Sequence, residues 1–149
     1  MTGRPAHAVG TSSRESKKKG LTMADIERNK QIATDYLDMA FNRQQVAEAF
    51  ARYVGDEYVQ HNPMAPDGAA ASAEFLAGFV ARFPKLRLEI KRVIAEADLI
   101  VTHALMRTSP DDRGTAVVDI LRIRDGRIAE HWDVAQAVPE TTANNNTMF

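Results

Sequence analysis

The chain contains no cysteine and no long apolar run, and both absences limit what it can do. Without cysteine it has no disulfide, no thiolate nucleophile and no cysteine-bound metal. No segment approaches the roughly 20 apolar residues that a membrane-spanning helix needs, and the N-terminal stretch lacks the apolar core of a secretory signal. The sequence therefore predicts a cytoplasmic protein that has no membrane partner.

The sequence also lacks the short signatures of several enzyme classes. It contains no glycine-rich phosphate loop, no dinucleotide fingerprint and no nucleophile elbow, which favours chemistry without a cofactor. None of the four histidines has a second histidine one helical turn away, the spacing typical of a compact metal site. Because His61, His103, His131 and Asp133 would converge on a metal ion only through the fold, we expect no metal.

Length and charge favour one acidic domain behind a basic extension. At 149 residues with 44% hydrophobic residues, the chain is long enough for a single domain with a real core. Residues 1–22 carry a net charge of +4, which leaves −5 on residues 23–149. We expect the extension to be disordered and residues 23–149 to form the domain. An acidic domain argues against nucleic acid as a partner, although the extension alone would suit a nucleic-acid arm.

Apolar residues recur at helical intervals in three segments. Thr22 and Asp25 have the spacing of a reciprocal helix cap, and the pattern after them predicts a helix over about 24–41. A second, shorter helix is expected to end at Gly55. A third helix is expected over about 71–82, just before a proline.

The second half of the chain changes to an alternating pattern that is typical of strands. After a short β-like run at 58–61, apolar and polar residues alternate from residue 86, again over 99–107, and in the segment 115–135. Helices followed by antiparallel strands predict an α+β domain, with three N-terminal helices packed on a curved, mostly antiparallel sheet. Such a sheet, wrapped around helices, leaves a conical cavity suited to a small molecule.

The segment 115–135 carries polar residues where an ordinary core strand would be apolar. If its two β-like runs are joined by a three-residue loop with Gly126 in a left-handed bulge, Asp119 faces His131 and Asp133 lies on the same face. Three ionisable side chains would then share one surface. We prefer this register.

A shorter loop gives a different outcome. If only Asp125 and Gly126 form the turn, the pairing shifts by one residue and Asp119 faces Trp132. The other two ionisable side chains then point to the opposite face of the sheet. The functional interpretation therefore depends on the register of this hairpin.

Asp119 interrupts an otherwise apolar strand, where an ionised carboxylate is costly unless it is paired. The plainer interpretation is a structural ion pair with Arg122 or Arg127 near the sheet edge. In the preferred register, Asp119, His131 and Asp133 instead form an acid–base unit that moves a proton between carbon and oxygen. We therefore take these three residues as the catalytic candidates.

Other residues are candidates for contact with a substrate. His61 and Asn62 enter a proline-rich loop, where they would donate hydrogen bonds to a carbonyl or enolate oxygen. Asn62 has an alternative role in capping the turn before Pro63. Three more candidates are more typical of packing than of ligand binding: His103, Trp132 and Tyr36.

Four segments taken together carry a family resemblance. They read YVQHNPMAPDG, KRVIAEAD, VVDILRIRDGRIAEHWDVAQAVPE and the final NNNTMF. On these segments the chain resembles the SnoaL-like polyketide cyclases, and among them the bacterial proteins described as SnoaL-like aldol-condensation enzymes. They belong to the nuclear-transport-factor-2-like superfamily of cone-shaped α+β barrels. The resemblance covers residues 23–149.

The resemblance implies an intramolecular aldol closure of a polyketide ester without metal or cofactor. It also implies a strand aspartate as general acid and base, which corresponds by position to Asp133. The family's assisting histidine, fourteen residues earlier, falls on Asp119. This chain departs from the family there, and either His131 offsets the change or the chemistry differs.

The sequence thus predicts a cofactor-independent lyase or isomerase that acts on a small apolar carbonyl compound through an enolate. One alternative is a non-catalytic ligand-binding or dimerisation module on the same fold. Another is an epoxide hydrolase or a ketosteroid-isomerase-like enzyme. We also expect a homodimer, because Val118, Ile120 and Trp132 would leave a mixed apolar surface on the outer face of the sheet.

Overall fold

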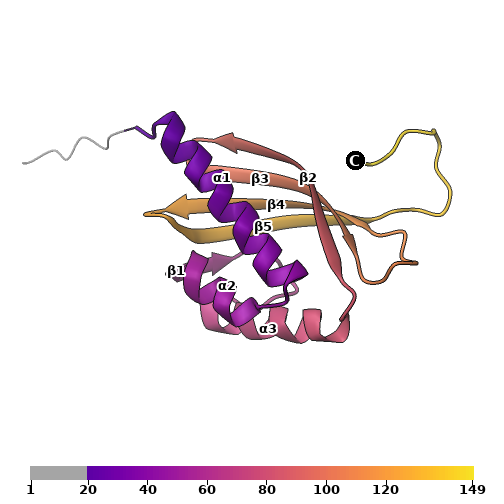
Figure 1. Cartoon of the computed structure of the whole chain (residues 1–149), viewed down its shortest axis with the longest axis horizontal. Helices are drawn as coiled ribbons and strands as arrows, with labels where there is room; N and C mark the ends of the chain where they lie inside the picture. The colour runs from indigo at the N-terminus through magenta and orange to yellow at the C-terminus, as the bar shows by residue number, and fades with distance from the viewer. Residues whose placement is uncertain (1–19) are drawn as a thin grey trace, which may run out of the picture.

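The computed structural model describes residues 20–149, so most of the predicted basic extension lies outside it. The described chain begins with helices and ends with strands (Figure 1). The elements are α1 (Met23–Leu37), η1 (Asp38–Asn42), α2 (Val46–Tyr53), β1 (Val54–Gln60), α3 (Ala69–Arg82), β2 (Arg87–Glu96), β3 (Leu99–Arg107), β4 (Thr115–Arg124) and β5 (Arg127–Ala137).

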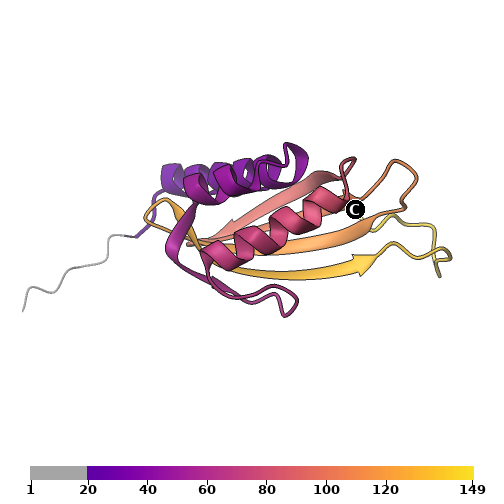
Figure 2. The same ribbon diagram turned by 90° about the horizontal axis from the view of Figure 1, so that it is seen from below.

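The five strands form one open, mixed sheet in the order β1-β5-β4-β3-β2. Strands β2 to β5 pair antiparallel, whereas β1 runs parallel to β5 at one edge. The helices lie on one face of the sheet (Figure 2). This architecture confirms the predicted α+β class, but the sheet does not close into a barrel because β1 and β2 remain separate edges. None of the described helices is long and apolar enough to cross a membrane.

The helix boundaries follow the predicted signals with small shifts. The backbone N–H of Asp25 donates to Thr22 Oγ1 at 3.1 Å, and the N–H of Thr22 donates to Asp25 Oδ2 at 3.0 Å, which confirms the reciprocal cap of α1. The wider turns of η1 extend α1 as far as Asn42. We predicted that the second helix ends at Gly55. Instead, α2 ends at Tyr53 and Gly55 lies within β1, because the chain enters the sheet directly at Val54.

The core lies between the helices and the inner face of the sheet. Leu37 from α1 packs there with Ile100, Leu121 and Ile128 from three neighbouring strands, and all four side chains are fully buried. Alternate residues of β4 take part, so Leu121 and Ile123 point inward together with Asp119. From Val117 to Ile123, the inner face of β4 is thus apolar except at Asp119.

The turn between β4 and β5 contains two residues, not three. Asp125 and Gly126 both have positive φ angles, of 50° and 74°, as a two-residue primed turn requires. Arg124 therefore pairs with Arg127. The prediction of a three-residue loop is therefore wrong. We had expected the left-handed conformation at Gly126 alone, but Asp125 adopts it as well.

A bulge in β5 nevertheless brings the three ionisable residues to one face. The pairing shifts between Ile123 and Arg122, which leaves Ala129 as an extra residue on β5. Beyond this bulge Asp119 lies directly opposite Asp133, rather than opposite His131 as predicted, and His131 points to the same face of the sheet. The shared face follows from the bulge and not from the turn.

Candidate active site

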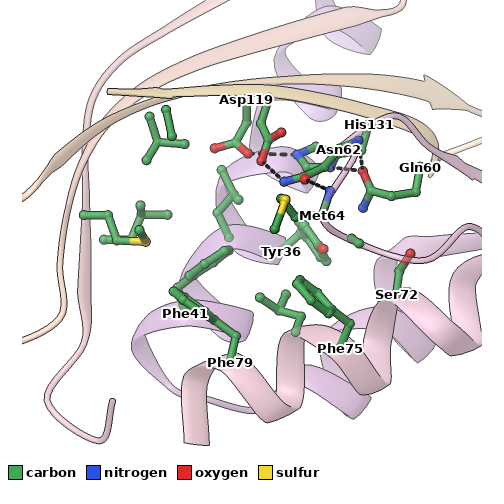
Figure 3. A pocket seen from close by; sticks show the side chains of 18 of the residues that line it. Tyr36, Phe41, Gln60, Asn62, Met64, Ser72, Phe75, Phe79, Asp119 and His131 are labelled. Carbon is green, nitrogen blue, oxygen red and sulfur yellow. Dashed lines mark hydrogen bonds and ion pairs between the residues drawn. The ribbon is translucent and has the colours of Figure 1, made fainter. Parts of the chain in front are cut away.

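A cavity of about 260 Å³ lies between the helices and the inner face of the sheet (Figure 3). Most of its wall is apolar and comes from Phe41, Phe75, Leu76, Phe79, Leu88, Met106 and Val117. Asp119, His131 and Asp133 line the same cavity together with the amides of Gln60 and Asn62, so a bound molecule would meet one polar cluster within mostly apolar walls. This is the usual composition of a small-molecule site.

The first polar contact in the cavity is a hydrogen bond between Asp119 on β4 and His131 on β5. His131 Nε2 lies 2.9 Å from Asp119 Oδ1, and both side chains are largely buried. On its other side, His131 Nδ1 lies 2.9 Å from Gln60 Oε1 at the end of β1. The imidazole is therefore held from both ring nitrogens.

The second polar contact fixes Asp133 through the loop that follows β1. Asn62 Nδ2 donates to Asp133 Oδ2 at 2.8 Å, while Asn62 Oδ1 accepts from the backbone N–H of Met64 at 2.8 Å. Because a backbone N–H only donates, the orientation of the Asn62 amide is defined. Asp133 Oδ1 makes no hydrogen bond with any described residue, so it remains free for a ligand.

Two tyrosines lie close to this polar cluster. Burial, followed by the charges of Tyr58 and then Asp119, raises the pKa of Tyr36 well above its usual value. Burial, followed by Asp119, also raises the pKa of Tyr58, whose hydroxyl accepts a hydrogen bond from Gln60 Nε2 at 2.9 Å. Tyr36 lines the cavity, and its hydroxyl makes no hydrogen bond with the described residues. It is a protonated donor available to a ligand.

The cluster also has the composition of a cation site. Among the described residues, Asp119, His131 and Asp133 form the one group of three whose ligand atoms all lie within 4.8 Å of one another. However, the Nε2 of His131 is already hydrogen-bonded to Asp119. A metal ion bound by these atoms would have to break this bond, so the arrangement suits proton transfer better.

Of the predicted substrate contacts, Asn62 and Tyr36 line the cavity, whereas His61, His103 and Trp132 do not. His61 stacks on Trp132 with ring centroids 4.5 Å apart and contacts Glu130 at 2.9 Å. The hydrogen bond from His61 is the largest influence lowering the pKa of Glu130. Because side chains alternate along a strand, Trp132 must face away from the cavity that His131 and Asp133 line.

His103 also lies outside the cavity. Its ring stacks on Phe149 with centroids 5.6 Å apart, and its Nδ1 is hydrogen-bonded to Arg92. It pairs with Val118 on β4, one position away from Asp119, and therefore points to the outer face.

Sequence reasoning did not assign Gln60 or the four phenylalanines of the wall to the cavity. Gln60 stands directly opposite His131 in the parallel pairing of β1 with β5, and parallel pairing of two distant segments leaves no local pattern in the sequence. Phe75 and Phe79 lie four residues apart on α3. Their spacing is that of a helical stripe, which does not distinguish a packed core from a cavity wall.

Residues 33–131 match the model of the SnoaL-like domain, which is about two thirds of the chain. The chain therefore belongs to the SnoaL-like domain family, within the nuclear-transport-factor-2-like superfamily. This confirms the resemblance found in the sequence. No curated protein matches the chain.

Solved structures share the fold at low sequence identity. A proposed polyketide cyclase from Bacillus cereus ATCC 10987 superposes with a TM-score of 0.65 at 18% identity, over 77% of this chain and 78% of that one. A proposed ketosteroid isomerase from Kribbella flavida DSM 17836 gives 0.64 at 20% identity, over 83% and 88%. AclR, a proposed hydroxylase from Streptomyces galilaeus, gives 0.62 at 21% identity, over 74% and 90%. At these identities the likeness shows the fold.

The contact between Asn62 and Asp133 predicts the effect of one substitution. Asn62→Asp keeps an acceptor for the Met64 N–H but turns a second carboxylate toward Asp133. We expect it to lower the free energy of unfolding by about 1–3 kcal/mol at neutral pH, because the half-buried Asp133 carboxylate loses its donor and faces a second negative charge. Denaturant unfolding measures this change.

Asn145→Asp provides the matched control, since Asn145 lies in the exposed C-terminal tail. Its unfolding free energy should stay within about 0.5 kcal/mol of the parent protein. Equal stabilities for the two variants would contradict the role of Asn62 in holding Asp133.

Proposed function

We propose that the protein is an acid–base enzyme that acts on a small apolar carbonyl compound through an enolate and uses no cofactor. The observation that carries this proposal is the free Oδ1 of Asp133, held beside the Asp119–His131 pair in a mostly apolar cavity. A carboxylate in such surroundings is a base able to take a proton from carbon.

The proposed reaction begins at Asp133. Its Oδ1 takes a proton from the carbon next to the substrate carbonyl, and the electron pair moves onto the carbonyl oxygen to form the enolate. The Tyr36 hydroxyl donates a hydrogen bond to that oxygen and stabilises the developing charge. Its raised pKa keeps this hydroxyl protonated, and it has no competing partner among the described residues.

Two outcomes are open to the enolate. In an aldol closure its carbon forms a bond to a second carbonyl carbon of the same molecule, and the resulting alkoxide takes a proton from the Asp119–His131 pair. The proton held by Asp133 then passes to this pair, which restores both groups. In an isomerisation, Asp133 returns its proton to another carbon of the enolate. Both routes balance without a metal, an oxidant or a reductant.

The structural neighbours support this class of reaction. One is described as a proposed polyketide cyclase and another as a proposed ketosteroid isomerase, and both names denote chemistry at a carbon next to a carbonyl group. An epoxide hydrolase would need an arginine between two aspartates in the cavity. Arg122 does not meet this need, because it bonds to Glu130 at 2.7 Å on the outer face.

We also propose that the protein works in the cytoplasm as a homodimer, with the outer face of the sheet as the interface. An apolar row crosses four strands on this face at directly paired positions: Ile94, Val101, Ile120 and Trp132. Val134, next to this row, is 70% exposed. The helices lie on the opposite face, and a second copy would cover this row with its own in a two-fold arrangement.

The first prediction of this proposal concerns the base, Asp133. In deuterium oxide the enzyme should catalyse exchange of the α-protons of 2-tetralone, an apolar ketone, as followed by proton NMR. We expect Asp133→Asn to lower this exchange rate by at least about 100-fold, because the amide cannot accept the proton. The introduced carbonyl still accepts from Asn62, so the melting temperature should hardly change.

Asp56→Asn is the control, since Asp56 is exposed on β1 and does not line the cavity. Its exchange rate should equal that of the parent protein. Saturable binding of 2-tetralone with no exchange at all would contradict the enzyme proposal and favour a ligand-binding module.

The second prediction concerns the oxyanion donor. Tyr36→Phe should lower the same exchange rate by about 100-fold, since removal of one such donor typically costs this much. The ring remains and keeps its edge-to-face contact with Phe50. Tyr53→Phe, outside the cavity, should exchange like the parent protein, and equal rates for both variants would remove Tyr36 from the mechanism.

The third prediction concerns assembly. Light scattering at micromolar concentration should give a dimer for the parent protein and a monomer for Ile120→Lys, because a charge in the middle of the row opposes its burial. Leu21→Lys, at an exposed apolar residue outside this row, should remain a dimer. A monomeric parent protein would exclude this interface.

A further inference from the structure

We propose that Gln60 is a positioning residue that fixes a proton on His131 Nδ1 and thereby keeps a transferable proton between His131 Nε2 and Asp119. This inference deepens the proposed function, on which its catalytic part rests. It concerns a residue that touches no reacting atom. It follows from hydrogen-bond donors and acceptors alone, and its structural part is testable without a substrate.

The orientation of the Gln60 amide is the first step. The backbone N–H of Asn62 lies 3.0 Å from Gln60 Oε1, and a backbone N–H can only donate. The atom facing it must therefore be the carbonyl oxygen. The amide nitrogen of Gln60 points the other way and donates to the Tyr58 hydroxyl at 2.9 Å.

The state of His131 is the second step. Gln60 Oε1 also lies 2.9 Å from His131 Nδ1, and an oxygen without hydrogen cannot donate. A hydrogen bond at this distance therefore requires the proton to reside on Nδ1. In a neutral imidazole, Nε2 then carries only a lone pair.

The contact with Asp119 is the third step. Since Nε2 has a lone pair in that tautomer, its 2.9 Å contact with Asp119 Oδ1 needs one additional proton. The proton resides either on Asp119 or on Nε2, and in both cases the pair of residues has no net charge. Asp133, directly opposite Asp119 on β5, then carries the one negative charge of the cluster.

Gln60 would thus divide the roles between two neighbouring carboxylates. Without an acceptor at Nδ1, a neutral His131 could place its single proton on Nε2 and leave Asp119 ionised beside Asp133. With Gln60 in place, Asp119 and His131 hold the proton that an alkoxide needs, and Asp133 remains the base. Two carboxylates with opposite tasks are a common arrangement for acid–base catalysis.

The backbone keeps Gln60 in place. It is the last residue of β1 and the direct partner of His131 in the parallel pairing with β5. The next residue donates its backbone N–H to the carbonyl oxygen of His131 at 2.9 Å. Both ends of the Gln60–His131 contact are therefore anchored in the sheet.

The test is nitrogen-15 NMR of the full chain labelled at histidine, with His131 assigned by comparison with His131→Gln. We expect a protonated Nδ1 on His131 in the parent protein. In Gln60→Met, which has a similar shape but no acceptor, the proton should move to Nε2. In Gln60→Glu, which keeps an acceptor, Nδ1 should stay protonated.

Gln45→Met serves as the control, because Gln45 is exposed and its side chain makes no capping hydrogen bond. Its His131 signals should match those of the parent protein. An unprotonated Nδ1 in the parent protein, or unchanged His131 signals in a folded Gln60→Met variant, would overturn the proposal.

Kinetics separate this inference from the function on which it rests. Gln60→Met should lower kcat for the intramolecular aldol closure of heptane-2,6-dione, an apolar diketone, by about 10- to 100-fold with KM changed less than about threefold, since it weakens proton donation to the alkoxide rather than binding. A tautomer shift with no exchange by the parent protein would reject the enzyme and retain the tautomer assignment. A tautomer shift with unchanged kcat would reject the catalytic role of Gln60.

Discussion

The candidate site depends on the pairing between β4 and β5. The two-residue turn alone would set Asp119 against Trp132 and send His131 to the outer face, where it could not meet the cavity. One extra residue, Ala129, reverses this outcome because it moves every later side chain of β5 by one position. The inner face then gains His131 and Asp133, and the outer face gains Trp132.

Holding two carboxylates and an imidazole in an apolar cavity requires specific compensation. Buried polar groups are costly unless they are hydrogen-bonded, and here the compensation comes from two side-chain amides, one at the end of β1 and one in the loop after it. Asn62 is oriented by the Met64 N–H and holds Asp133, while Gln60 is oriented by the Asn62 N–H and holds His131. Each amide is fixed by a backbone donor, so its orientation does not depend on the ligand.

Local patterns in the sequence predicted the fold well. The reciprocal cap at Thr22, the three helices and the alternating strands each follow from neighbouring residues, and all are present. The site was harder to predict, because it depends on a bulge that no residue in the sequence indicates and on the parallel pairing of β1 with β5. The three ionisable residues do share one face, but the loop length that we used to place them was wrong. Gln60 went unnoticed for the same reason, since only the folded sheet brings it to His131.

Strand β5 links the cavity to the outer surface. Its inward residues, His131 and Asp133, alternate with Glu130 and Trp132, which join His61 and Arg122 in a polar and aromatic cluster outside. Because both sets share one backbone, any contact that stiffens the outer cluster also restrains the positions of the acids inside. The geometry of the candidate site is therefore supported from two sides, by the amides of Gln60 and Asn62 and by the packing around Trp132. A partner on the outer face would strengthen the second support without touching a reacting atom.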